Sequence, residues 1–237
     1  MSIGISEEHV ELARSLREWA ASLGGREAAR DAEGDVEATF ADSWKACVDM
    51  GVASIGLPEA TGGGGGTVLD VAVALEACAH ELVPGPLLST AVAASLLGAT
   101  PFASTLADGA AVAIELNGGP AGDLAGASHV LRPDGDRWVI APVESTRPAQ
   151  GVDLTRRFGE LSAGLGDVVP GLTVELVRRA HVTLAAAEAA GVARWCLETA
   201  VGYAKVREQF GQKIGAFQAV KHPVSYTHLT LPTNREV

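Results

Sequence analysis

The residues with the clearest capacity for chemistry lie near the end of the chain, in the segment YAKVREQFGQKIGAFQAVKH at 203–222. Arg207 and Lys213 place two cations beside a predicted helix end, where a guanidinium fork can hold an anion such as a diphosphate through charge-assisted hydrogen bonds. Cations near helix C-termini also offset the helix dipole, so the pattern alone leaves both interpretations open. Gly211 permits a left-handed turn after the helix, and a second helix is predicted to start near Ala216.

One long helix must position this segment. No proline interrupts the chain from Thr173 to Gln209, and apolar or small residues recur every three or four positions. At about 1.5 Å per residue this helix extends about 50 Å, which exceeds one face of a small domain. Part of it is therefore expected to pack against another domain or another subunit.

The elements before that helix change character near residue 110. The first part is predicted to be helical. One helix is capped by Ser6 and ends at Gly24-Gly25, and a short one lies around Trp44 to Met50. A further helix is capped by Thr67 and ends at Pro84-Gly85-Pro86, and it is followed by one over 88–97 and a short one after Pro101. On the helix after Thr67, Asp70, Glu76 and His80 are expected to point away from the apolar face. β-prone runs follow at 111–116, 129–133 and 137–142, with a further strand at 152–158. The order predicts an α+β fold that is mainly α, with a small β segment between two helical parts.

Composition excludes several classes of protein. The chain has 237 residues, of which 47% are hydrophobic and 20% charged, so it should fold rather than remain disordered. With 18 Lys and Arg against 29 Asp and Glu, the formal charge is 18 − 29 = −11. A duplex nucleic-acid binder needs a basic footprint, so this charge argues against nucleic acid and likewise against anionic membranes.

The cysteines and the ends of the chain predict a reduced, cytoplasmic protein. Cys47, Cys78 and Cys196 form no CxxC pair, so neither a disulfide framework nor a zinc site is expected. The N-terminus lacks a basic region followed by an apolar one, and no window approaches the ~18 apolar residues of a membrane span, so no membrane insertion is expected.

Other candidate motifs are weak. The glycines at 62–66 do not follow a strand as a dinucleotide-binding turn would, and His80-Glu81 lacks the second histidine of a zinc protease motif. Neither a nucleophile elbow nor a phosphate-binding P-loop occurs. His9, His129 and His181 are expected to be surface or core residues, so no metal site is predicted.

Two stretches resemble one known family. The run R-x-x-F-G-x-x-I-G-x-F-Q-A-V-K-H resembles the segment after the first helix of the C-terminal domain in acyl-CoA dehydrogenases, and GLPEATGGGGGTVLDVAVALEACAHELVPGPLLST at 56–90 is similar to their N-terminal helical domain. The resemblance covers nearly all of residues 1–222. It implies an N-terminal helical domain (1–108), a reduced middle β domain (109–171) and the first helices of a C-terminal helical bundle (172–222).

The resemblance also implies a function. Acyl-CoA dehydrogenases use FAD for the α,β-dehydrogenation of an acyl-CoA thioester, as homo- or hetero-oligomers that an electron-transfer flavoprotein reoxidises. In the family the corresponding residues contact the cofactor, typically that of the neighbouring subunit, which implies that Arg207 meets the diphosphate, Phe210 packs near the flavin and Gln218 hydrogen-bonds to it. The alternative for Phe210 is a core anchor. No catalytic residue is assigned, because the family's glutamate base belongs to later helices.

The sequence departs from the family in its middle segment and at its end. IELNGGPAGD at 114–123 stands where catalytic members carry T-E-P-x-x-G-S-D, so hydroxyl groups that meet flavin and acyl-CoA are missing. PGP at 84–86 and DLTRRF at 153–158 resemble the actinobacterial, sterol-catabolic type, some of which are heteromers. The chain could therefore be a non-catalytic partner subunit that contributes FAD contacts only. Residues 223–237, PVSYTHLTLPTNREV, contain neither Ala nor Gly and are expected to be a non-native tail.

Overall fold

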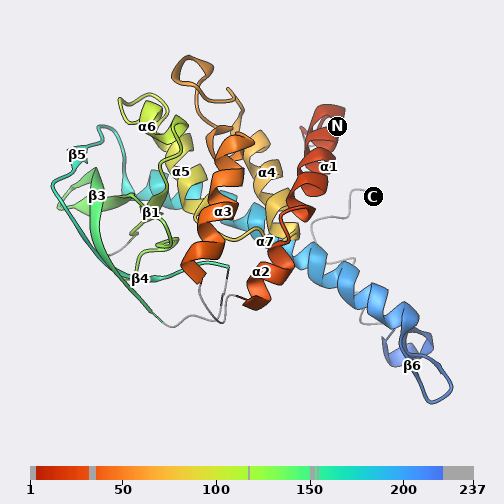
Figure 1. Ribbon diagram of the computed structural model, residues 1–237. Helices are drawn as coiled ribbons and strands as arrows, with labels where there is room; N and C mark the ends of the chain where they lie inside the picture. Colours follow the sequence, from red (N-terminus) through yellow and green to blue (C-terminus); the bar gives the residue numbers. More distant parts are fainter. Residues whose placement is uncertain (1–3, 32–35, 117, 150–152, 154, 221–237) are drawn as a thin grey trace.

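Capping residues set the starts of two long helices. In the computed structural model, which describes residues 4–31, 36–116, 118–149, 153 and 155–220, α1 (Glu7–Ala21) starts at Ser6 and α4 (Val68–His80) starts at Thr67. The Thr67 hydroxyl accepts the Asp70 backbone N–H at 3.4 Å, and an Asp70 carboxylate oxygen accepts the Thr67 N–H at 2.7 Å. Both predicted helix starts are confirmed (Figure 1).

The region after α1 holds more helix than expected. Gly24 has a φ of 65°, which ends α1, but α2 (Gly25–Asp31) begins at the next residue. A Cβ at Gly25 would lie 2.6 Å from the carbonyl oxygens of Glu81 and Leu82. Glycine is therefore required at this position because the two backbone segments approach closely, and it does not end a helix. The helix expected around Trp44 is α3 (Val36–Asp49), which is longer than predicted.

The helical core centres on α5 (Leu87–Leu97), which is followed by the short α6 (Ala103–Ala107). Nine of the eleven residues of α5 are buried, as expected for a helix that is apolar on all sides. Side chains of α4, α5, the sheet and the following long helix join one hydrophobic cluster.

A small mixed sheet packs beside the helices. Its strands are β1 (Val112–Ile114), β2 (His129–Asp134), β3 (Arg137–Pro148), β4 (Gly159–Ala163) and β5 (Asp167–Val168). The order is β1-β2-β3-β4, with β1 and β2 parallel, the other pairs antiparallel, and β5 also paired with β3. Trp138 on β3 is 2% exposed and joins the sheet to the helical core.

The strand predicted at 152–158 is wrong where the structure describes it. Residues 153 and 155–158 lie outside any strand, and β4 begins only at Gly159. Their carbonyl groups serve other partners, since Thr155 accepts the Gly85 N–H at 3.0 Å and Arg157 accepts the Leu124 N–H at 2.9 Å. The segment therefore joins the sheet to the helices.

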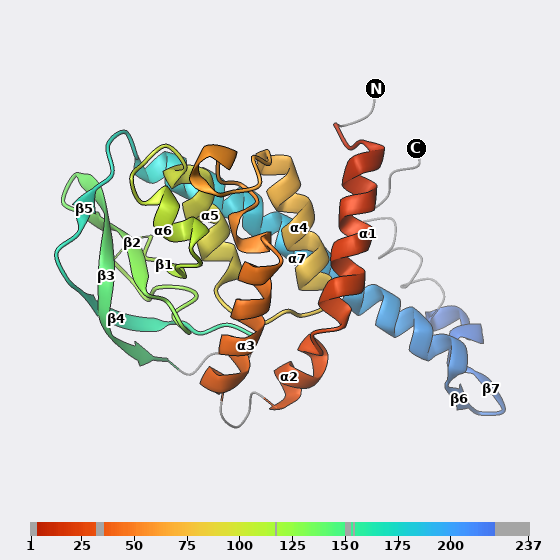
Figure 2. The same cartoon turned by 45° about the horizontal axis from the view of Figure 1, so that its top comes forward.

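The predicted long helix is α7 (Val174–Val206), with 33 residues. Its buried residues Val177, Leu184 and Gly191 recur every seventh position and face the helical layer. A Cβ at Gly191 would lie 2.2 Å from the Glu76 carbonyl oxygen, so α7 and α4 touch backbone to backbone there. Beyond that crossing α7 projects past the other helices and ends far from the sheet (Figure 2). The order of helical, β and helical parts is the predicted one. None of the described helices is long and apolar enough to cross a membrane.

Candidate functional site

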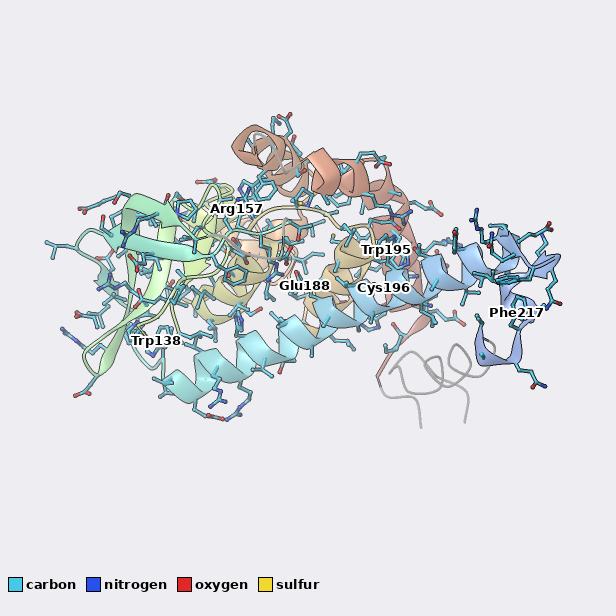
Figure 3. All side chains as sticks on the ribbon, turned by 90° about the horizontal axis from the view of Figure 1, so that it is seen from below. Trp138, Arg157, Glu188, Trp195, Cys196 and Phe217 are labelled. Atoms are coloured by element: carbon cyan, nitrogen blue, oxygen red, sulfur yellow. The ribbon has the colours of Figure 1, made fainter. Side chains whose placement is uncertain are left out.

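The segment after α7 forms a projecting arm, defined here as residues 207–218. It contains a hairpin of β6 (Glu208–Gln209) and β7 (Gln212–Lys213) and a single turn of 3-10 helix at Ile214–Ala216. The residues that follow become helical only at Gln218, so the second helix begins later than the predicted Ala216. Figure 3 shows Phe217 in the arm at one end of α7, away from Trp138 in the sheet at the other.

The two cations expected at the helix end are not equivalent. Arg207 caps the C-terminus of α7 through its backbone N–H, which donates to Tyr203 at 2.9 Å. Lys213 lies opposite Glu208 in the hairpin, and their side chains form an ion pair at 3.6 Å. No side chain of the described residues pairs with the Arg207 guanidinium. Among the described residues, Arg207 is therefore the cation of the arm without an ion-pair partner.

Phe210 occupies the tip of the hairpin. Its φ of 54° and that of Gly211, 79°, are both positive, as a two-residue type I′ turn requires. The left-handed region suits glycine and costs a bulky residue about 1–3 kcal/mol. The side chain is 93% exposed and meets the ring of Phe217 edge to face, with 6.5 Å between centroids. Phe210 is thus no core anchor of this chain, and the predicted turn at Gly211 is confirmed.

Gln218 is exposed where the chain returns to helix after the arm. Together with the free guanidinium and the exposed ring, its amide gives the arm donors, an acceptor and an apolar face. These groups suit a ligand with a diphosphate and an aromatic ring system. The arm residues thus fit the part of FAD that the family resemblance implies.

The middle stretch 114–124 offers much less to a cofactor. Ala121 donates its N–H to Gly159 at 2.8 Å, Gly122 to Ile114 at 3.1 Å, and Leu124 to Arg157. These three N–H groups are therefore already used within the chain and are not available to a flavin.

Asp123 ties that stretch to the helices. It is 1% exposed, has a φ of 59°, and accepts the N–H of Ser89 in the first turn of α5 at 2.9 Å. Arg156 lies 3.7 Å from the other Asp123 oxygen and also pairs with Glu188 on α7. Nearby His181 has a pKa lowered by burial, with Asp123 raising it and Arg156 lowering it. Asp123, Arg156 and Glu188 thus join the sheet loop, α5 and α7.

A second polar cluster lies between α4 and α7. His80, expected on a polar surface, is 7% exposed and touches Glu81 through Nδ1 at 2.7 Å and Glu198 through Nε2 at 2.9 Å. Burial raises the pKa of Glu198, but the hydrogen bond and charge of His80, together with Arg194, outweigh it and lower that pKa. The sequence missed this cluster because its partners are far apart along the chain.

Other candidate sites carry no chemistry in the described part of the chain. No group of three His, Cys, Asp or Glu side chains could hold a metal ion among those residues. A hollow of about 370 Å³ beside α3 is lined by Phe40, Ala41, Trp44, Lys45, Ala125 and Gly126. Its lysine is already paired with Asp49 at 2.5 Å. Cys47 and Cys78 are buried, whereas Cys196 is exposed.

Comparison with known proteins identifies the family. The model described as acyl-CoA dehydrogenase, N-terminal domain, matches residues 6–104, and the model described as acyl-CoA dehydrogenase, C-terminal domain, matches residues 179–234. Acyl-CoA dehydrogenase IpdE2 of Mycobacterium tuberculosis is 34% identical over 94% of this chain and 73% of the relative. The chain belongs to the acyl-CoA dehydrogenase family. The resemblance seen in the sequence is confirmed.

The chain spans only part of the length of two further relatives. Acyl-CoA dehydrogenase FadE34 of M. tuberculosis is 36% identical over 92% of this chain, and the chain spans 35% of FadE34. It spans 62% of acyl-CoA dehydrogenase IpdE2 of Mycolicibacterium smegmatis, at 34% identity. Among solved structures, the Tcur3481-Tcur3483 steroid ACAD variant has a TM-score of 0.76 at 23% identity, with 94% of this chain and 73% of that chain covered. At that identity the likeness shows the fold, which confirms the α+β prediction.

Proposed function

We propose that this chain is part of an FAD-dependent enzyme that dehydrogenates an acyl-CoA thioester at its α,β positions, and that Arg207, Phe210 and Gln218 contact the cofactor. The observation that carries the proposal is the arm, in a chain of this family, which holds a guanidinium without an ion-pair partner among the described residues and a 93% exposed phenyl ring. The solved neighbour PigA with FAD and proline has a TM-score of 0.73 at 16% identity and is consistent with a flavin-binding fold.

Each arm residue has a distinct task. The Arg207 fork matches the oxygens of a diphosphate, Phe210 covers apolar ring surface, and Gln218 donates and accepts at a polar ring edge. When bound, the flavin supplies the hydride acceptor for the β-carbon. No described residue of this chain is assigned the α-proton. An electron-transfer flavoprotein is the proposed partner that reoxidises the enzyme, and the C-terminal bundle is proposed to begin at residue 172.

A second candidate is a partner subunit that contributes cofactor contacts to another chain. Two observations favour it: the N–H groups of Ala121, Gly122 and Leu124 are used within the chain, and the arm points away from the sheet (Figure 1). The ChsE4-ChsE5 complex of M. tuberculosis, a solved neighbour with a TM-score of 0.69 at 19% identity, is an assembly of two different chains. A sterol-derived acyl group is the proposed substrate class, in line with the neighbour named a steroid ACAD.

Flavin content separates the two candidates. The chain is expressed alone and together with a homologous acyl-CoA dehydrogenase chain, and bound flavin is measured by absorbance after purification. A protein that is colourless alone and yellow in the complex supports the partner subunit, whereas stoichiometric FAD on the lone chain supports a self-sufficient site.

Variants of the arm test the residue assignment in whichever state binds flavin. Arg207→Ala is expected to weaken FAD binding about 10- to 100-fold, because it removes a charge-assisted hydrogen bond worth about 1.5–3 kcal/mol. Lys213→Ala is the matched control, since that side chain is already paired with Glu208. Equal losses in both variants contradict a specific role for Arg207.

A further inference from the structure

The ring of His80 lies between two carboxylates from different elements. His80 is the last residue of α4, Glu81 follows it directly, and Glu198 lies on α7. The distances from the ring nitrogens to the two carboxylates are 2.7 Å and 2.9 Å, and the ring is buried. These three residues are called the His80 clasp below.

Counting protons determines the state of the ring in this geometry. A neutral imidazole has one N–H, and an ionised carboxylate only accepts, so both short contacts are hydrogen bonds only when both ring nitrogens carry protons. The position at the C-terminus of α4 favours a cation as well, because the last carbonyl groups of a helix carry partial negative charge. We propose that the His80 clasp is a proton-dependent tie that holds α7, and the arm it carries, on α4.

The charges around the clasp balance without the histidine. Three arginines and three glutamates face it from α1, α2, α4, its C-cap and α7: Arg17, Arg26, Glu76, Glu81, Arg194 and Glu198. Arginine stays charged at all pH values of interest, and His80 is the histidine of this group, so the ring proton is the charge that the clasp can gain or lose.

Loss of that proton acts on the α7 side of the clasp. One ring nitrogen then presents a lone pair to a carboxylate at less than 3 Å, and one contact must open. Glu81 has an 11% exposed side chain and is also held by Arg26 at 2.8 Å, whereas the Glu198 side chain is 55% exposed. Glu198 is also bonded to Arg194 at 3.3 Å, but Arg194 lies on the same helix and can follow it toward solvent. The bond between His80 and Glu198 is therefore the one that opens, which removes one contact between α4 and α7.

The position of Glu198 makes this contact important for the arm. Within the described chain, Glu198 is the last residue of α7 with a polar contact to another helix. The next close contact of α7 is to the arm itself, because a Cβ at Gly215 would lie 2.8 Å from the Ala204 carbonyl oxygen. Protonation of the His80 ring thus stabilises the packing of the last turns of α7 against α4, and this stabilisation is lost as pH rises. Only the link from arm position to flavin binding rests on the proposed function.

Two measurements on the whole chain test the clasp without any cofactor. Nitrogen-15 NMR of the histidine rings, assigned with His80→Gln, is expected to show two protonated nitrogens for His80 at the acid end of a pH series. Hydrogen exchange of residues 195–206, corrected for its intrinsic pH dependence, is expected to become about tenfold faster when the ring loses its proton. This factor corresponds to the lower end of the energy range for a hydrogen bond to a charged group, because Glu198 is half exposed.

Two variants make the outcome decisive. Glu198→Gln changes a half-exposed side chain and should leave the fold intact, and it is expected to remove the pH dependence of exchange in 195–206. His9→Gln is the matched control, since His9 pairs with Asp70 at 3.2 Å far from that segment. A His80 ring that stays neutral at every pH at which the chain is folded, or equal pH dependence in Glu198→Gln and the unaltered chain, overturns the proposal. If the clasp behaves as expected but flavin binding does not follow it, the proposed function of the arm fails and the clasp stands.

Discussion

The crossing of α4 and α7 at Gly191 offers a sharp test of the packing. Gly191→Ala adds one methyl group on the side of α7 that faces α4. That carbon would lie 2.2 Å from the Glu76 carbonyl oxygen and 3.1 Å from the Ala79 Cβ. Ordinary carbon contacts need about 3.5 Å, so the helices must separate by roughly 1 Å.

The size of the effect follows from two opposing terms. Overpacking a well-packed site costs about 1–3 kcal/mol, and the upper end applies because a backbone carbonyl cannot rotate away. Replacing glycine by alanine inside a helix stabilises the helix by about 1 kcal/mol. The free energy of unfolding should therefore fall by about 2 kcal/mol.

Urea unfolding followed by circular dichroism measures the change. For a slope of about 2 kcal/mol/M, the midpoint should move down by roughly 1 M. Gly202→Ala is the control on the same helix, since a Cβ there meets nothing within 4 Å, and it should stabilise by about 0.5–1 kcal/mol. If Gly191→Ala is as stable as the unaltered chain, the close approach of the two backbones is refuted.

Three further predictions use the same chain. Asp123→Asn should lower the free energy of unfolding in urea by about 2 kcal/mol, because the buried carboxylate that bonds to α5 loses its charge beside a guanidinium; an unchanged midpoint contradicts this. The hydrogen bond from Thr67 lowers the pKa of Asp70, so the stability that this carboxylate adds should be present above its ordinary pKa and be lost as pH falls through the lowered one; the stability difference between Asp70→Asn and the unaltered chain, measured against pH, should shrink in acid. Cys196 should react with a thiol reagent in the folded chain, whereas Cys47 and Cys78 should react only after unfolding, because burial raises the pKa of Cys47 to about 12 and raises that of Cys78 as well; three fast thiols in the native chain would contradict the buried positions.

Local signals in the sequence predicted the helices well. Ser6 and Thr67 cap helices through bonds that span three residues, so their role is visible within a short window. Gly25 misled the prediction because its reason lies in the carbonyl groups of residues 81 and 82, which no local pattern records. His80 was misplaced for the same reason, since Glu198 is 118 residues away.

The candidate site was predicted in part. Gly211 correctly marked the turn of the arm. The hairpin was missed, because its strands have two residues each and no alternating pattern to detect. That hairpin pairs Lys213 with Glu208, whereas Arg207 has no ion-pair partner in the part of the chain that the structure describes. The cofactor roles of the arm residues remain predictions, and the expected non-native tail lies outside the described residues.

The crossing at Gly191 also makes α7 a lever. Fifteen residues separate Gly191 from the end of the helix at Val206, and at about 1.5 Å each they form a rod of roughly 22 Å with its pivot at the Glu76 carbonyl. A tilt of about 5° at the pivot displaces the far end by about 2 Å, which is enough to break a hydrogen bond made by Arg207. Small changes in the packing of α4 are therefore magnified at the arm.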